Sequence, residues 1–141
     1  MVGNSRGGND TLTGGNGGVN FLYGDAFSMS DNARGGNDTL ISGTGTDHMW
    51  GDAQVIDGGS VVTGADTFVF APGNGNDDIG DFRQSDHDKI DVSAYGFHTL
   101  ADMMLIDLGA DTKIAFDATN SVTLVGISDP GVLQASDFIF A

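Results

Sequence analysis

The sequence predicts an all-β fold, a flattened parallel solenoid of about three coils that a small β-rich C-terminal region caps. Three observations support it. The phrase Gly-Gly-Asn-Asp-Thr-Leu occupies residues 7–12 and returns unchanged at residues 35–40. A looser copy, Gly-Ala-Asp-Thr-Phe, follows at residues 64–68, so the phrase recurs every 28 residues. Further glycine-rich turns lie between these copies, and glycine becomes sparse after residue 81.

Each repeat is expected to form one coil with two short strands. It contains two glycine-rich turns that end in Asp or Asn, and an apolar residue follows two positions later. Glycine allows the positive φ angles and the close backbone approach that tight turns require. The apolar residue then starts a very short strand that points inward. Residues 27–34 and 54–62 are expected to be loops that interrupt this minimal repeat.

The repeat also predicts a ligand. Stacked coils bring the same carboxylate of each copy together, here those of Asp10, Asp38 and Asp66. Neighbouring carboxylates repel one another unless a cation lies between them. Calcium is the first hypothesis, because it accepts several oxygen ligands from Asp side chains and backbone carbonyls.

Composition narrows the function classes. The chain has 141 residues with a formal charge of −15, and all 20 acidic residues are Asp. With only five Lys and Arg, nucleic acid and anionic membranes are excluded as partners. There is no Cys for a disulfide or zinc-thiolate site, no apolar stretch of transmembrane length, and no visible Sec signal peptide. A merely acidic, soluble surface is the alternative explanation of the charge.

Residues 82–141 have a different pattern, so we divide the chain into a solenoid at 1–81 and a capping region at 82–141. Alternating apolar residues predict strands over 89–92, 113–116 and 121–127, with a hairpin turn at 117–120. Residues 99–105 fit a short helix that Thr99 would cap. This region would cover the open end of the solenoid, where strand edges are otherwise unpaired.

The turns resemble the nonapeptide Gly-Gly-x-Gly-x-Asp-x-apolar-x of the RTX (repeats-in-toxin) calcium-binding family. The resemblance covers residues 7–81, and the step from Asp38 to Asp47 shows its nine-residue spacing. The chain departs from the pattern at Asn20, where the family has Asp, and at Thr44 and Ala65. The family fold is a parallel β-roll, and residues 78–93 are similar to the closing segment of serralysin-type RTX domains.

The resemblance implies calcium ions between successive turns, held by turn carbonyls and by Asp of adjoining coils. It implies a second row opposite the first, formed by Asn20, Asp47 and Asp77, and about four ions in all, two on each side. The ion between Asn20 and Asp47 is expected to be the weakest. Asp25 and Asp52 recur in Gly-Asp-Ala and are expected to add carboxylates, although Asp after Gly is also a common turn residue. The full set of expected metal-binding positions is Gly7, Asn9, Asp10, Asn20, Asp25, Gly35, Asn37, Asp38, Gly45, Asp47, Asp52, Gly64, Asp66, Gly75 and Asp77.

No catalytic constellation is visible, so we expect no enzyme activity. The chain lacks Glu and Cys, has no Gly-x-Ser-x-Gly elbow, and places its three His without metal-ligand spacing. The missing Glu also excludes an EF-hand.

The RTX resemblance implies an extracellular module that a type I (ABC) exporter secretes unfolded and that folds on calcium. Residues 136–141 resemble the uncleaved C-terminal signal of such exporters, and a terminal edge strand is the alternative. The module would form the tail of, or an accessory to, a secreted protein such as a protease or lipase. Two other functions stay open: binding of acidic polysaccharide, as in alginate epimerases, and a structural or adhesive role. In the adhesive case residues 27–34 and 54–62 would supply the contact surface, through Phe27, Met29, Val55, Ile56, Val61 and Val62.

Overall fold

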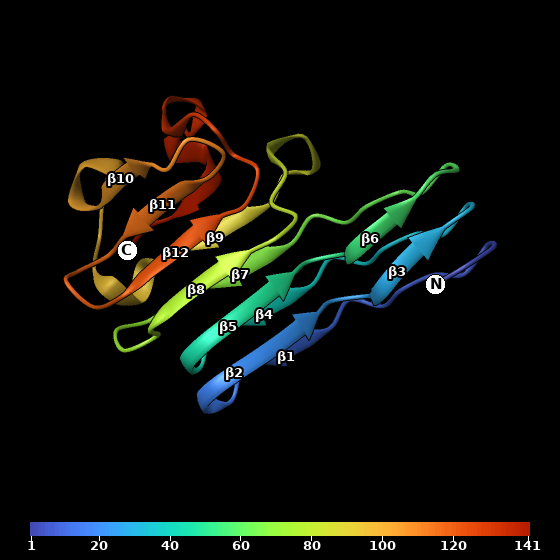
Figure 1. The fold of residues 1–141 in the computed structure, drawn as a ribbon, viewed down its shortest axis with the longest axis horizontal. Helices are drawn as coiled ribbons and strands as arrows, with labels where there is room; N and C mark the ends of the chain where they lie inside the picture. The colour runs from blue at the N-terminus through green and yellow to red at the C-terminus, as the bar shows by residue number, and fades with distance from the viewer.

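The computed structural model describes all 141 residues as an all-β molecule, a flattened parallel β-roll with a cap at its C-terminal end (Figure 1). This confirms the predicted fold class. The helical segments are single 3-10 turns, and no helix is long and apolar enough to cross a membrane. These turns are Gln84–Asp86, Ser93–Tyr95, Leu100–Asp102, Pro130–Val132 and Ala135–Asp137.

Two sheets enclose the main core. The first sheet is parallel throughout and runs in the order β1 (Thr11–Thr13), β4 (Thr39–Ile41), β7 (Thr67–Val69), β9 (Lys89–Asp91) and β13 (Phe138–Ile139). The second sheet has the order β10 (Met104–Asp107), β11 (Thr112–Ala115), β12 (Ser121–Leu124), β8 (Asn76–Ile79), β5 (Thr44–Trp50) and β2 (Asn16–Tyr23). Its strands are parallel from β2 to β12, whereas β10 and β11 pair antiparallel.

The 28-residue repeat corresponds to one coil. Thr11 pairs with Thr39, and Thr39 pairs with Thr67, so equivalent residues lie directly above one another. The following residues, Leu12, Leu40 and Phe68, form an inward ladder in the same register. A one-residue slip would turn this ladder outward, and for that reason the buried face fixes the register.

The segments 27–34 and 54–62, expected as loops, instead widen each of the first two coils. β3 (Ala26–Ser30) and β6 (Ala53–Asp57) pair in parallel as a third, two-stranded sheet. Figure 1 shows this sheet beyond the ends of β2 and β5. The chain returns opposite it through parallel bridges that join Arg34 to Arg6 and to Val62. The expectation of two strands per coil is therefore wrong for these coils, which have three.

The widened part of the coils has an apolar interior of its own. Met29, Ala33 and Ala53 form a small second core, against which Ile56 and Val61 pack. Met29 is fully buried, so it does not belong to an exposed contact surface as expected for the adhesive case. Burial of these side chains explains why the segments extend as strands rather than loop outward.

The C-terminal region completes the sheets of the roll. β9 and β13 extend the first sheet, β12 extends the second, and residues 117–120 join β11 to β12 as a hairpin. The helix expected over residues 99–105 is wrong. Only Leu100–Asp102 form a 3-10 turn, whose start is fixed when the Asp102 carboxylate accepts the N–H groups of His98 and Thr99. The chain then alternates as a strand, with Met103 buried and Met104 exposed.

Candidate metal centre

Carboxylates line the coil interior between the main core and the second core. Along the outgoing limb the chain passes from Leu22 in the main core through Asp25 to Met29 in the second. Along the return limb it passes from Ala33 in the second core through Asp38 to the main core. We define row A as the Asp that immediately precede β1, β4, β7 and β9, namely Asp10, Asp38, Asp66 and Asp88. We define row B as the Asp two positions after β2, β5 and β8, namely Asp25, Asp52 and Asp81.

Row A is a ladder of carboxylates that accept backbone N–H groups. Asp10 donates its N–H to Oδ1 of Asp38 at 2.7 Å, Asp38 to Asp66 at 2.8 Å, and Asp66 to Asp88 at 2.9 Å. Each coil thereby holds the carboxylate of the next coil against its own backbone. The ladder fixes the orientation of one oxygen of each carboxylate and leaves the other to point elsewhere.

Those second oxygens have no partner at two positions. Asp38 and Asp66 are each 1% exposed, and their Oδ2 atoms are buried with no hydrogen bond. Buried polar groups in proteins are almost always hydrogen-bonded, and an unsatisfied one costs about 1–3 kcal/mol, or more when charged. Two such atoms at equivalent positions of successive coils indicate a repeated site for a positively charged ligand.

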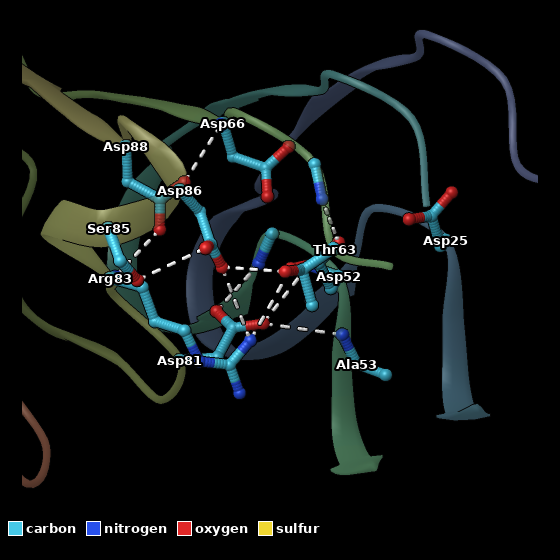
Figure 2. Close-up of polar contacts among 12 residues, drawn as sticks. Asp25, Asp52, Ala53, Thr63, Asp66, Asp81, Arg83, Ser85, Asp86 and Asp88 are labelled. Carbon is cyan, nitrogen blue, oxygen red and sulfur yellow. Dashed lines mark hydrogen bonds and ion pairs between the residues drawn. The ribbon is translucent and has the colours of Figure 1, made fainter. Parts of the chain in front are cut away.

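Row B is held by backbone donors and one guanidinium. Asp25 accepts the N–H of Gly36, Asp52 accepts that of Gly64 at 2.6 Å, and Asp81 accepts that of Gly51 at 2.8 Å. Figure 2 shows the C-terminal end of row B, where the Arg83 side chain lies among the Asp side chains. Its Nη1 lies 3.8 Å from Asp52 and 3.6 Å from Asp86. Arg83 is the one cation that the protein itself brings to this centre, and its ion pairs reach Asp52 and Asp86 but not Asp38 or Asp66.

Glycines make room for the facing carboxylates. A Cβ on Gly24 would stand 2.3 Å from Oδ2 of Asp38, and one on Gly51 would stand 2.1 Å from Oδ2 of Asp66. A Cβ on Gly35 would meet Asp52 at 2.4 Å and Asp25 at 2.5 Å. A side chain at any of these three positions would force a neighbouring group to move. The space beside each unpartnered oxygen is thus created by the absence of a side chain.

The electrostatics of rows A and B disfavour free carboxylates. Burial raises the pKa to about 6 for Asp25 and Asp88, to about 7 for Asp52 and to about 8 for Asp66, and it raises the pKa of Asp38 and Asp81 above the ordinary 3.8. Neighbouring carboxylates add to the shift, as those of Asp52 and Asp88 do for Asp66. Burial therefore disfavours the ionised form of these groups inside the coil, and a bound proton or metal cation would stabilise them.

The row on the opposite side, row C, is built differently. Its members Asn20, Asp47 and Asp77 stack as expected, with the Asn20 amide 2.7 Å from Asp47 and the Asp47 N–H 2.9 Å from Asp77. Neutral groups satisfy the remaining oxygens: the Gly43 N–H donates to Asp47 at 2.8 Å, Asn74 donates to Asp77 at 2.8 Å, and the Ser42 hydroxyl lies within hydrogen-bond distance of both carboxylates and can donate to either. Row C therefore has neutral donors where Asp38 and Asp66 of row A have unpartnered oxygens.

Calcium fits the centre between rows A and B. No three acidic or histidine side chains converge closely enough to hold a metal by themselves. A calcium site here must combine carboxylates with backbone carbonyls, which is the ligand mixture that Ca²⁺ accepts. Beside Gly24 the two ligand types meet, since the Gly51 carbonyl oxygen lies 1.9 Å and Asp38 Oδ2 2.3 Å from the same Cβ position. The chemistry of these donors, anionic and neutral oxygen, suits a hard divalent cation.

The other expected positions lie around these rows. Gly7, Gly35 and Gly64 are return-limb residues, of which Gly7 and Gly35 donate their N–H groups to the next coil's carbonyls and Gly64 donates to Asp52. Asn9 and Asn37 form an exposed amide ladder, each accepting an N–H of the following coil. Gly45 and Gly75 bridge near row C. The structure thus brings Asp25 and Asp52 directly opposite Asp38 and Asp66, and it separates them from Asp47 and Asp77.

Three residues of the centre were not among the expected positions: Asp81, Asp88 and Arg83. Asp81 follows Gly80 in the same Gly-Asp pair as Asp25 and Asp52, so this dipeptide was a usable sign. Asp88 comes 22 residues after Asp66 and lacks the glycine-rich turn, hence the repeat does not indicate it.

Fold and centre together define a class, the parallel β-roll with a carboxylate-lined interior. No protein-family model and no curated protein matches the chain. Among solved structures, an extracellular lipase from Serratia marcescens, LipA, matches with a TM-score of 0.52 and 23% sequence identity. The match covers 99% of this chain and 21% of the lipase chain, so this chain spans about a fifth of the lipase's length. At this identity the likeness supports the β-roll fold alone.

Proposed function

We propose that the chain is an extracellular calcium-binding module of the RTX type, whose β-roll is stable only when calcium is bound. The observation that supports this most directly is the pair of buried, unpartnered oxygens, Asp38 Oδ2 and Asp66 Oδ2, in glycine-lined spaces. Bound calcium would supply the positive charge that the protein does not. Asp38, Asp66 and the Gly51 carbonyl would hold it, with Asp25 and Asp52 on the facing limb.

Folding and calcium binding are coupled in this proposal. The chain carries a formal charge of −15 and 23 glycines, so repulsion and backbone entropy both oppose the compact state. A site occupied at 100 times its dissociation constant stabilises the fold by about 2.7 kcal/mol. Two ions in successive coils would together contribute about 5 kcal/mol, which is comparable to the whole stability of a small domain.

The same coupling suits secretion in an unfolded state. Extracellular calcium modules bind with dissociation constants of about 10⁻⁴ to 10⁻³ M, far above the free calcium inside a cell. The chain would stay unfolded until a type I exporter has secreted it, and the β-roll would form outside the cell. The RTX resemblance and the fold it shares with an extracellular lipase support this assignment. As such a module it would serve a larger secreted protein, for example a protease or lipase.

The test is folding of the full chain with calcium, with magnesium and with excess chelator. Far-UV circular dichroism reports the sheets, and fluorescence of Trp50 reports the middle of row B, since Trp50 lies two residues before Asp52. We expect β structure to appear with calcium only, and native mass spectrometry to count at least two bound ions. A β-sheet spectrum that persists unchanged in chelator at neutral pH and low ionic strength would contradict the proposal.

A contact module is the second candidate, because one outer face carries exposed rings. Phe21 is 60% exposed and stacks on His48, and Phe27 is 59% exposed and lies edge-on to Tyr23. Trp50 stacks on Tyr23 in the same face. Polysaccharide or protein could contact these rings. Binding of the calcium-loaded chain to a glycan array, lost in a Phe21→Ala and Phe27→Ala double variant, would favour this candidate.

A further inference from the structure

Two of the five cationic residues lie side by side without any acidic partner. Arg6 and Arg34 are 28 residues apart and face each other across a parallel bridge between the return limbs of the first two coils. The ion pairs of the protein involve Arg83 and His48, so neither of these guanidinium groups has a carboxylate within 4.0 Å. In a chain with 20 Asp residues this placement is unexpected, because two adjacent positive charges repel each other.

The two arginines line a polar pocket. It has a volume of about 330 Å³ and five lining residues, none of them apolar or acidic: Asn4, Arg6, Asn32, Arg34 and Ser60. The asparagines and the serine also repeat at intervals of 28 residues, and the Asn32 amide donates to Asn4 at 3.3 Å. Every lining side chain therefore carries hydrogen-bond donors. A pocket of this composition has no anionic group for a cation, and it has two guanidinium groups and several neutral donors for an anion.

We propose that Arg6 and Arg34 together bind one oxyanion, a sulfate or carboxylate group, in this pocket. Guanidinium groups present planar sets of donors that match such anions, and two of them on neighbouring strands can hold oxygens of the same group. The amide and hydroxyl groups of Asn4, Asn32 and Ser60 would contribute neutral hydrogen bonds.

The same geometry favours a single anionic group over a long polyanion. The third coil carries Val62 at the position that is Arg6 in the first coil and Arg34 in the second, so the positive strip ends after two coils. The remaining surface is strongly acidic and repels an extended chain of negative charges. The site lies on the outside of the return limb and is separate from the carboxylates of rows A and B.

The direct test follows the arginine side-chain Nε–Hε signals by NMR in the calcium-loaded full chain. Sodium sulfate is titrated against sodium chloride at matched ionic strength. We expect saturable shifts of the Arg6 and Arg34 signals with sulfate and an unmoved Arg83 signal. Equal, unsaturable shifts of all three arginines in both salts would overturn the proposal, and so would unmoved Arg6 and Arg34 signals in both sulfate and acetate. Because the sample is folded and loaded with calcium, a negative result would leave the calcium function untouched.

Two charge-removing substitutions, one in the pocket and one outside it, test whether this pocket binds the anion. Arg34→Gln removes one of the two guanidinium groups and is expected to weaken sulfate binding by about tenfold or more, since a charge-assisted contact is lost. Lys113→Gln removes the same charge from β11 of the second sheet, outside the pocket. It is expected to change sulfate binding by less than about twofold, through general electrostatics only. Equal effects of the two variants would show that net charge, and not this pocket, attracts the anion.

The carrier of the anion is then identified by comparison. Inorganic sulfate, acetate, a sulfated monosaccharide and a uronic acid monosaccharide are titrated under the same conditions. Tighter binding of one sugar than of the matching free anion assigns the site to a glycan substituent, and equal binding assigns it to a free anion. Both results support the oxyanion site, whereas failure of all four probes to move Arg6 and Arg34 refutes it.

Discussion

Single carboxylate oxygens determine the chemistry of the metal centre. In row A one oxygen of each buried carboxylate accepts a backbone N–H, while Oδ2 of Asp38 and of Asp66 lacks a donor. In row C both oxygens of Asp47 and Asp77 are satisfied by protein groups. Residues that look equivalent in the repeat therefore differ in the ligand they need, and this difference can be measured.

Replacement of Asp66 by Asn tests the unpartnered oxygen. The amide can keep the hydrogen bond from the Asp38 N–H but loses the negative charge. We expect calcium affinity to fall by about tenfold or more, as for the loss of a charged ligand. In chelator the stability should stay unchanged or rise, because the Asp66 carboxyl, with its pKa raised to about 8, is costly to ionise inside the coil.

Isothermal titration with calcium measures the affinity, and circular dichroism in chelator at pH 5, where protonated carboxyls oppose folding least, measures the stability without calcium. The matched control is Asp47→Asn in row C, whose surroundings are neutral donors. It should lower calcium affinity by less than Asp66→Asn does. The assignment of calcium to rows A and B would be wrong if Asp47→Asn had the larger effect.

A second residue-scale prediction concerns the glycine opposite Asp66. Gly51→Ala would place a Cβ 2.1 Å from Asp66 Oδ2, in the space assigned to the ion. We expect about 1–3 kcal/mol of destabilisation in calcium, the usual cost of overpacking, together with weaker calcium binding. Gly8→Ala serves as the control, since its Cβ would stand 3.4 Å from the nearest atom and should change stability by less than about 0.5 kcal/mol. Equal urea midpoints for both variants would argue against a confined site.

At the scale of elements, rows A and B act as a titrating ladder between two apolar cores. Burial raises the pKa above 3.8 in the folded state for Asp25, Asp38, Asp52, Asp66, Asp81 and Asp88, to between about 6 and about 8 at four of these positions. The folded state then binds more protons than the unfolded state between pH 4 and 8, approximately. Unfolding free energy must fall as pH rises across this interval, provided that no metal is bound.

We therefore expect the chelated protein to be more stable at pH 5 than at pH 8. Far-UV circular dichroism in chelator at several pH values, which measures the fraction of chain that is folded, provides the test, and the trend should weaken in Asp66→Asn. In saturating calcium the protein should instead be more stable at pH 8 than at pH 5, because deprotonated carboxylates bind the ion. A chelated protein whose stability increased from pH 5 to pH 8 would show that the carboxylates are solvated and not confined within the coil.

The third sheet is the other element with a measurable role. Met29 is fully buried in the second core, whereas Phe27 on the same strand is 59% exposed. Met29→Ala is expected to cost about 2–4 kcal/mol in calcium through loss of buried surface and a residual cavity. Phe27→Ala should cost less than about 1 kcal/mol. A Met29→Ala variant as stable as wild type would mean that β3 and β6 contribute nothing to the folded unit.

For the molecule as a whole, the C-terminal region is part of the roll rather than an appendage. β9 and β13 extend one sheet and β12 extends the other, and Asp88 ends the ladder of row A. A chain ending at residue 81 would lose the buried side chains of Ile90, Val122 and Phe138 from the main core. We expect this truncated chain to show no β-sheet spectrum even in saturating calcium, as measured by circular dichroism. Calcium-induced folding of residues 1–81 alone would show that the coils need no cap.

The sequence by itself determined the all-β class, the 28-residue coil and the stacking of Asp10, Asp38 and Asp66. These features are local, since each repeated turn fixes its own glycine geometry and the apolar residue after it fixes the register. Strands near residues 90, 114 and 122 followed from alternation for the same reason. Calcium as the ligand stays a prediction, which the sequence suggests because repeated carboxylates on stacked coils repel one another without compensating charge.

Only the tertiary structure decided which carboxylates face each other. Residues 27–34 and 54–62 fold as a third sheet with its own core, and this widening places Asp25 and Asp52 opposite row A. The tertiary structure also brings Asp88 to row A from a segment without a repeat. It places Ser42 and Asn74, which lie outside the motif, where they donate hydrogen bonds to row C. Apart from the local Asn74–Asp77 hydrogen bond, these contacts join residues distant in sequence, so they depend on how the limbs and coils pack and no repeat period encodes them.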